Sequence, residues 1–171
     1  MSAGTLKLGA AGGATNTPLG TTGAGTTVAS GATLDLDGFT LGTAEALTLN
    51  GTGVSGAGAL TNTGSTASYS GLVTLGSAST ISTNAGDINL TNVGTITGAT
   101  FGLTLGGSGN GSVTSIIGTT TGTLTKAGAG TWTLGGVNTY TGLTTVNAGS
   151  LTYGVTNAIS TGAVTVNDGG T

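Results

Sequence analysis

Short runs of alternating apolar and hydroxyl-bearing residues recur along this chain, and glycine or asparagine closes each run. They are "TLKLG" from Thr5, "TLDLDG" from Thr33, "ALTLNG" from Ala46, "LVTLG" from Leu72, "DINLTN" from Asp87, "GLTLGG" from Gly102, "TWTLGG" from Thr131, "SLTYG" from Ser150 and "AVTVNDGG" from Ala163. Threonine and valine are stiff at χ1 and favour strands, whereas glycine permits the positive φ values of tight turns. The pattern predicts an all-β fold of many short strands.

Composition supports this fold and excludes other classes. Of the 171 residues, 36% are apolar and 4% are charged, whereas disorder requires low hydrophobicity with high net charge. Collagen requires glycine at every third position and abundant proline, but this chain has 37 glycines and a single proline. Helical spacing of apolar residues is close to absent, with residues 44–49 as a mild exception.

Among all-β architectures, a β-solenoid suits these strands better than a sandwich or a barrel. Small residues fit the narrow interior of a solenoid turn, and stacked turns pair their strands along the whole axis. At about 20 residues per turn the chain makes roughly eight turns, and at ~4.8 Å per turn it is a rod on the order of 40 Å long. We therefore expect residues 1–171 to form a single β-solenoid segment.

Several kinds of site lack the residues they need. The chain has two lysines, five acidic residues, and no histidine, cysteine or arginine, for a net charge of −3. Zinc sites, disulfides and the usual nucleophilic triads cannot be assembled from this set, and we expect no cofactor. So few basic residues also argue against a nucleic-acid surface. The sequence shows no apolar run long enough to span a membrane as a helix and no signal peptide after Met1.

A longer repeat is suggested by the two ends of the chain. "AGTLKLG" at residues 3–9 resembles "AGSLTYG" at residues 148–154, and "VASGAT" at residues 28–33 resembles "VNDGGT" at residues 166–171. Residues 148–171 are therefore interpreted as the start of a second copy of a unit of about 140 residues. On this interpretation the chain is a slice of a tandem array, to which Met1 was added as a start codon.

Two aspartates are the candidates for acid chemistry. "LDLDG" places Asp35 and Asp37 two residues apart, on one face of a strand. Glycoside hydrolysis requires two carboxyl groups ~5–10 Å apart, and Ca²⁺ could also be held by such a pair with turn carbonyls. The remaining acidic residues, Glu45, Asp87 and Asp168, show no turn-like spacing from the pair. The favoured interpretation is a solvated strand end that keeps the rod soluble.

Threonine pairs raise another alternative, an ice-binding face. Thr-x-Thr occurs at "TNT" from Thr61, "TIT" from Thr95, "TWT" from Thr131 and "TYT" from Thr139. These spacings are not a constant turn period, which disfavours an ice-binding array, and a thermal hysteresis measurement tests it.

One segment is similar to a known repeat family. "LTKAGAGTWTLGGVNTYTGLTTVNAGSLTYG", at residues 124–154, resembles the autotransporter-associated β-strand repeat through "LTKAGAGTWTL", "NTYTG" and "TTVNAGSL". The resemblance implies a right-handed parallel β-helix in the passenger region of a bacterial autotransporter or related surface protein. It also implies an extracellular or cell-surface location and a role as stalk, adhesin or display scaffold. The translocator barrel of such proteins has no counterpart in this chain.

Within this segment, Trp132 and Tyr140 are the candidate ligand contacts. Aromatic side chains bury the largest apolar area, so core packing is favoured over sugar stacking, with Trp132, Leu134, Leu151 and Tyr153 facing inward. The predicted function is a non-enzymatic stalk or fibre segment that associates with itself through its end turns. The alternative is an adhesin that binds a glycan or a host protein near Trp132 and Tyr140. A β-helix enzyme using Asp35 and Asp37 ranks third.

Overall fold

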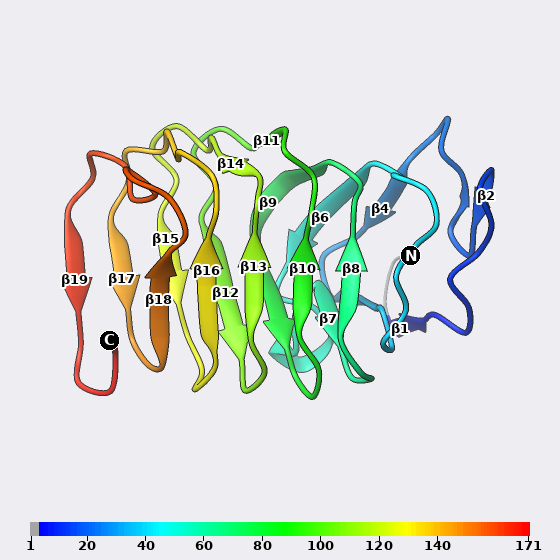
Figure 1. Ribbon diagram of the computed structural model, residues 1–171, viewed down its shortest axis with the longest axis horizontal. Coiled ribbons are helices and arrows are strands. Elements are labelled where there is room, and N and C mark those ends of the chain that lie inside the picture. The colour runs from blue at the N-terminus through cyan, green and yellow to red at the C-terminus, as the bar shows by residue number, and fades with distance from the viewer. Residues whose placement is uncertain (1–3) are drawn as a thin grey trace.

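The computed structural model describes residues 4–171, which form a rod of stacked turns (Figure 1). Within these residues the only helical element is a short 3₁₀ turn, Val54–Gly56. The strands pair in parallel, except for a small hairpin of β2 (Asn16–Thr17) and β3 (Gly20–Thr21). The predicted all-β solenoid is confirmed.

The strands lie on faces that continue from turn to turn. The largest sheet contains β1 (Gly4–Lys7), β4 (Thr26–Val28), β5 (Ala32–Asp35), β6 (Leu47–Gly51), β7 (Leu60–Asn62), β9 (Val73–Thr83), β12 (Leu103–Gly107), β15 (Leu124–Lys126), β17 (Thr144–Val146) and β19 (Val164–Val166). The second sheet contains β8 (Ala67–Tyr69), β10 (Ile88–Leu90), β13 (Gly111–Val113), β16 (Thr131–Leu134) and β18 (Ser150–Tyr153). A narrow third sheet pairs β11 (Thr95–Ile96) with β14 (Ile116–Ile117).

Consecutive turns are in register, so one residue from each turn contributes to a column along the rod. The column through the largest sheet is Leu6, Leu34, Leu60, Ile81, Leu105, Lys126, Val146 and Val166. This path of eight strands makes seven steps along the axis, close to the number of turns expected from the sequence, although the turns are not of constant length. The early turns are longer, since Gly4 pairs with Ala32, 28 residues later, whereas Thr144 pairs with Val164, 20 residues later.

The winding of the chain is right-handed. In Figure 1 the strands of the second sheet point upward on the near side, and β9, β12 and β15 point downward behind them. The chain advances from right to left as it makes these circuits. That combination is a right-handed path, as the family resemblance implied.

The core is a set of inward-facing columns. Along β12, Leu103 and Leu105 are buried while Thr104 between them is partly exposed, as the period of two predicts. Aliphatic side chains fill most of the column positions, and their removal from water is the main stabilising term at roughly 25 cal/mol per Å². The buried residues form one continuous cluster from Leu8 to Ala158.

Threonines form ladders on the outer faces. Thr80, Thr104, Thr125, Thr145 and Thr165 are paired one above another on the largest sheet. On the second sheet the outward column is Ser68, Asn89, Ser112, Thr133 and Thr152. Each turn contributes one residue to such a ladder, and of the Thr-x-Thr motifs considered in the sequence, the one from Thr131 contributes Thr133 to these two columns while the others contribute no residue to them.

The unit of about 140 residues stays a prediction. Of the two pairs of similar segments, the first lies on different faces, because residues 4–7 form β1 of the largest sheet and residues 150–153 form β18 of the second sheet. Their similarity in sequence is therefore not matched by the same position within a turn.

Candidate functional site

Trp132 lies in the interior of the rod. Its side chain is 0% exposed, and its indole Nε1 donates a hydrogen bond of 3.0 Å to the carbonyl oxygen of Gly106 on the opposite sheet. The preceding residue of its column is Gly111, where an added Cβ would lie 2.5 Å from the indole ring. The ring thus occupies the space that a side chain at position 111 would need, and it joins the two sheets.

Tyr140 is also completely buried, and its hydroxyl shares a 2.7 Å hydrogen bond with Thr144 Oγ1. Neither Trp132 nor Tyr140 therefore presents a ring face to solvent, as core packing, the favoured interpretation of these two aromatics, requires. Tyr153 was expected to be buried, but its side chain is 60% exposed. It follows Leu134 in the inward column, and no further turn covers it among the described residues.

The buried phenols predict a specific alkaline response. Burial raises the pKa of Tyr69, with the Glu45 charge adding to the effect, and burial also raises the pKa of Tyr140. A phenol with a raised pKa stabilises the folded state below the ordinary value of 10.0, and this contribution is lost as the pH rises through the folded-state pKa. We expect both phenols to ionise together with unfolding in a spectrophotometric titration.

Phenylalanine variants provide the control for that titration. Tyr69→Phe and Tyr140→Phe should each remove one of the late-titrating phenols. Ionisation of Tyr69 and Tyr140 near pH 10.0 with the circular dichroism unchanged would contradict the burial of both rings.

Asp35 and Asp37 lie in different surroundings. Asp35 is only 3% exposed, and its carboxylate accepts hydrogen bonds from the backbone N–H groups of Asp37 and Thr63, both at 3.0 Å, and from Thr63 Oγ1 at 2.5 Å. Asp37 lies beyond the end of β5 in a turn with a φ of 47°, and it pairs with Lys7 at 3.0 Å. The expected solvated strand end is therefore wrong for Asp35, whose carboxylate fixes a turn, and the two acids do not share a strand face.

Lys126 is a buried cation that the sequence analysis did not single out. It occupies a position in the inward column between Leu105 and Val146, and its side chain is 0% exposed. Its ammonium donates hydrogen bonds to the carbonyl oxygens of Ala127 at 3.0 Å, Gly128 at 2.7 Å and Ala148 at 3.0 Å. Burial lowers the pKa of this lysine. The ammonium ties the turn after β15 to the equivalent turn after β17.

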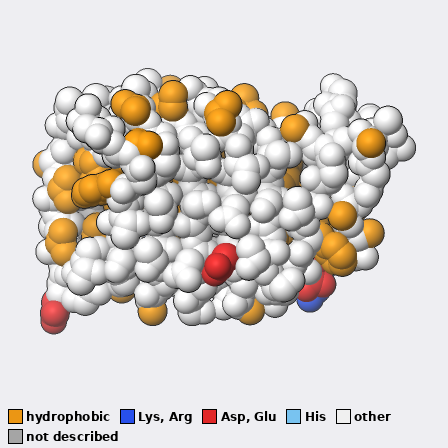
Figure 2. Space-filling view, viewed as in Figure 1, with side chains coloured by type: hydrophobic (Ala, Val, Ile, Leu, Met, Phe, Trp, Pro, Cys, Tyr) orange, Lys and Arg blue, Asp and Glu red, His pale blue; other side chains and the backbone are white. Residues whose placement is uncertain are grey.

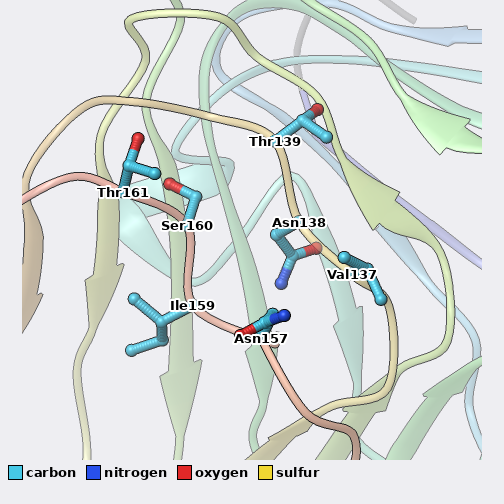
Figure 3. A pocket seen from close by; sticks show the side chains of 7 residues that line it. All are labelled: Val137, Asn138, Thr139, Asn157, Ile159, Ser160 and Thr161. Carbon is cyan, nitrogen blue, oxygen red and sulfur yellow. The ribbon is translucent and has the colours of Figure 1, made fainter.

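An open groove of about 610 Å³ lies near the end of the rod that contains β19 (Figure 3). Two adjacent turns line it, with Val137, Asn138 and Thr139 on one side and Asn157, Ile159, Ser160 and Thr161 on the other. The Asn138 side chain links the turns, since its Oδ1 accepts from the N–H of Ile117 at 2.7 Å and its Nδ2 donates to the carbonyl of Ala158. Ser160 Oγ is buried without a hydrogen-bond partner. The groove contains no charged side chain.

The outer surface offers little other chemistry. Figure 2 shows a face that is mostly uncharged, with apolar side chains along its upper margin and in groups at both ends of the rod. Residues 4–171 contain no group of three or more potential metal ligands. Nor do these residues include a helix with the length and hydropathy needed to cross a membrane.

Comparison with known proteins identifies one segment. No curated protein and no solved structure matches the chain. Residues 124–152 match the family model of the passenger-associated-transport-repeat. This segment contains β15, β16 and β17, together with Lys126, Trp132 and Tyr140, so the matched residues are those that build and connect two successive turns. The resemblance found in the sequence is confirmed, since residues 124–152 match a repeat family of autotransporter passenger regions.

Proposed function

We propose that this chain is a non-catalytic structural segment of the passenger region of a bacterial surface protein, acting as a stalk or scaffold outside the cell. The observation that carries the proposal is the burial of three polar or aromatic side chains of the matched segment. Lys126, Trp132 and Tyr140 are all buried and bonded to neighbouring backbone or side chains, so the matched segment is used for building the stack. Its outer faces carry uncharged ladders such as Thr125, Thr145 and Thr165.

Resistance to proteolysis tests this role. A stalk made of continuous parallel sheets offers proteases few segments that can open locally. We expect the 171-residue chain to survive a nonspecific protease that digests unfolded protein, and to appear as short rods by negative-stain microscopy. Rapid cleavage throughout the β12 to β18 region would contradict a structural role.

Self-association through end turns is a further part of the proposal. β19 pairs on one side with β17 and has no strand on its other side among the described residues. Val164 and Val166 continue columns that are buried in earlier turns, yet they are 47% and 55% exposed. An open strand edge beside uncovered apolar side chains favours pairing with a second copy. Sedimentation over a range of concentrations measures this association.

The groove at residues 137–139 and 157–161 favours a second candidate function, binding of an uncharged glycan. Its amide, hydroxyl and aliphatic side chains are suited to a neutral polyol. A glycan array tests this with the wild type and with Thr139→Arg and Thr161→Arg, which obstruct the groove from exposed positions. Binding that both variants abolish would support an adhesin, whereas absence of binding by the wild type supports the stalk alone. Trp132→Ala is unsuitable for this test because it alters the core.

A further inference from the structure

The first turn of the rod differs from all later ones. Between β1 and β4 the chain leaves the parallel stack and forms the antiparallel hairpin of β2 and β3. Figure 1 shows this hairpin at the extreme end of the rod, beyond β1. An antiparallel hairpin in this place interrupts the repeating geometry that the other turns share.

Residues 8–25 are packed against the next turn. Leu8 is buried and its N–H donates to the carbonyl of Asp35 at 2.9 Å, while Leu19 packs against the core. The N–H of Gly42 donates to the carbonyl of Ala11 at 3.2 Å. A Cβ at Gly42 would lie 2.9 Å from the carbonyl oxygen of Gly13, so the two segments approach closely. These residues therefore cover the segment around residue 42.

Glu45 connects this covering segment to the stack. It is 1% exposed, and its two carboxylate oxygens accept hydrogen bonds from Thr17 Oγ1, at 2.5 Å, and from Thr26 Oγ1. Its backbone carbonyl accepts a 2.7 Å hydrogen bond from the hydroxyl of Tyr69, on the first strand of the second sheet. A carboxylate in the interior is costly unless its oxygens are bonded, so Glu45 depends on both threonines. One residue thus holds together the hairpin, β4 and β8.

We propose that residues 8–25 are a cap that prevents a second copy of this chain from stacking on the first turn, and that Glu45 is the latch that holds the cap closed. The inference rests on the self-association proposed above. It predicts two unequal ends, with association at β19 and none at β1. Two copies can then meet through their β19 ends as a closed pair, but the pair cannot grow into a filament.

The edge that the cap leaves uncovered is itself protected. β1 spans four of the described residues and ends at Lys7, whose ammonium pairs with Asp37. Short edge strands and edge lysines are among the features by which proteins avoid edge-to-edge pairing. The hairpin beyond β1 also prevents another rod from approaching that strand end-on (Figure 1).

The test combines hydrogen exchange with sedimentation velocity on the 171-residue chain. In Glu45→Ala, which removes both acceptors, we expect protection of residues 8–25 to fall by about 10- to 100-fold, while the strands from β12 to β16 keep theirs. With the cap open, species larger than two chains should form, whereas the wild type should stop at two. Thr17→Val is a milder variant that removes only the hydrogen bond between the hairpin and Glu45. It should also lower the protection of residues 8–25 and allow species larger than two chains, to a smaller extent.

Glu45→Gln is the matched control, because it removes the same charge but keeps an amide that can bond both hydroxyls. It should behave as the wild type, with residues 8–25 protected and no large species. Wild-type filaments would overturn the proposal, since the cap would then not block stacking. So would Glu45→Ala or Thr17→Val chains that lose protection at residues 8–25 and still form nothing larger than the wild type does. Either result leaves the stalk function intact, because that function requires no association between chains.

Discussion

Replacing Trp132 with alanine is expected to destabilise the turns around it by about 3–5 kcal/mol, the usual cost of deleting a large buried aromatic side chain. The indole fills the interior between the two sheets, and its removal also leaves the buried carbonyl of Gly106 without its donor. Since the rod is quasi-one-dimensional, we expect hydrogen exchange to quicken in β13, β16 and β18 first. Trp132 is the only tryptophan, so urea unfolding of the variant is followed by circular dichroism.

Gly111 supplies a matched test of the same contact. A Cβ at this position would meet the indole ring at 2.5 Å, so Gly111→Ala should cost about 1–3 kcal/mol in the wild type. In a Trp132→Leu background the ring is gone and the added methyl group has room, so the same change should cost much less. Tyr153→Ala is the control for an aromatic residue of the same segment that is exposed, and it should change stability by at most about 0.5 kcal/mol. Equal costs of Gly111→Ala in both backgrounds would contradict the packing.

The strands and the architecture could be predicted from the sequence because their signals are local. The alternation in "TWTLG" is enough to assign Trp132 and Leu134 to one face, and they are buried together. The unequal lengths of the turns could not be predicted, because the longer early turns contain segments, such as the hairpin of β2 and β3, whose glycine- and threonine-rich composition resembles that of the strands. No local pattern separates such an excursion from a regular turn.

The side chains at the candidate sites depend on the register between turns, which the sequence does not display. Asp35 is buried because Thr63, 28 residues away, lies beside it with two donors. Tyr153 and Leu134 occupy the same column, but within the described residues only Leu134 of these two has a turn on each side. Lys126 could have been found only by aligning its strand with neighbours that place Leu105 and Val146 at the same position. Its signal in the sequence is that it is the only lysine of the second half of the chain.

Replacing Lys126 with alanine is expected to cost about 3–5 kcal/mol, because it removes a buried alkyl stem from the core and leaves three carbonyl oxygens without their donor. Lys126→Met separates these two contributions. Methionine keeps a stem of similar length in the aliphatic column and removes the charge, and apolar replacements of buried charges are often nearly neutral. The methionine variant should therefore lie at least about 2 kcal/mol above the alanine variant in unfolding free energy.

The charge itself is tested by pH. Because burial lowers the pKa of Lys126 below the ordinary value of 10.5, the unfolded chain binds more protons than the folded chain between these two values. Stability conferred by this group therefore rises as the pH rises through the folded-state pKa toward 10.5. The buried tyrosines make the same contribution to the pH dependence of stability in both chains, so this contribution cancels when the wild type is compared with Lys126→Met. Urea unfolding at about pH 8 and about pH 10 should show the wild type gaining stability relative to the variant. A difference that does not change with pH would mean that the ammonium is as well solvated in the folded rod as in the unfolded chain, and the lysine would then have to lie outside the column.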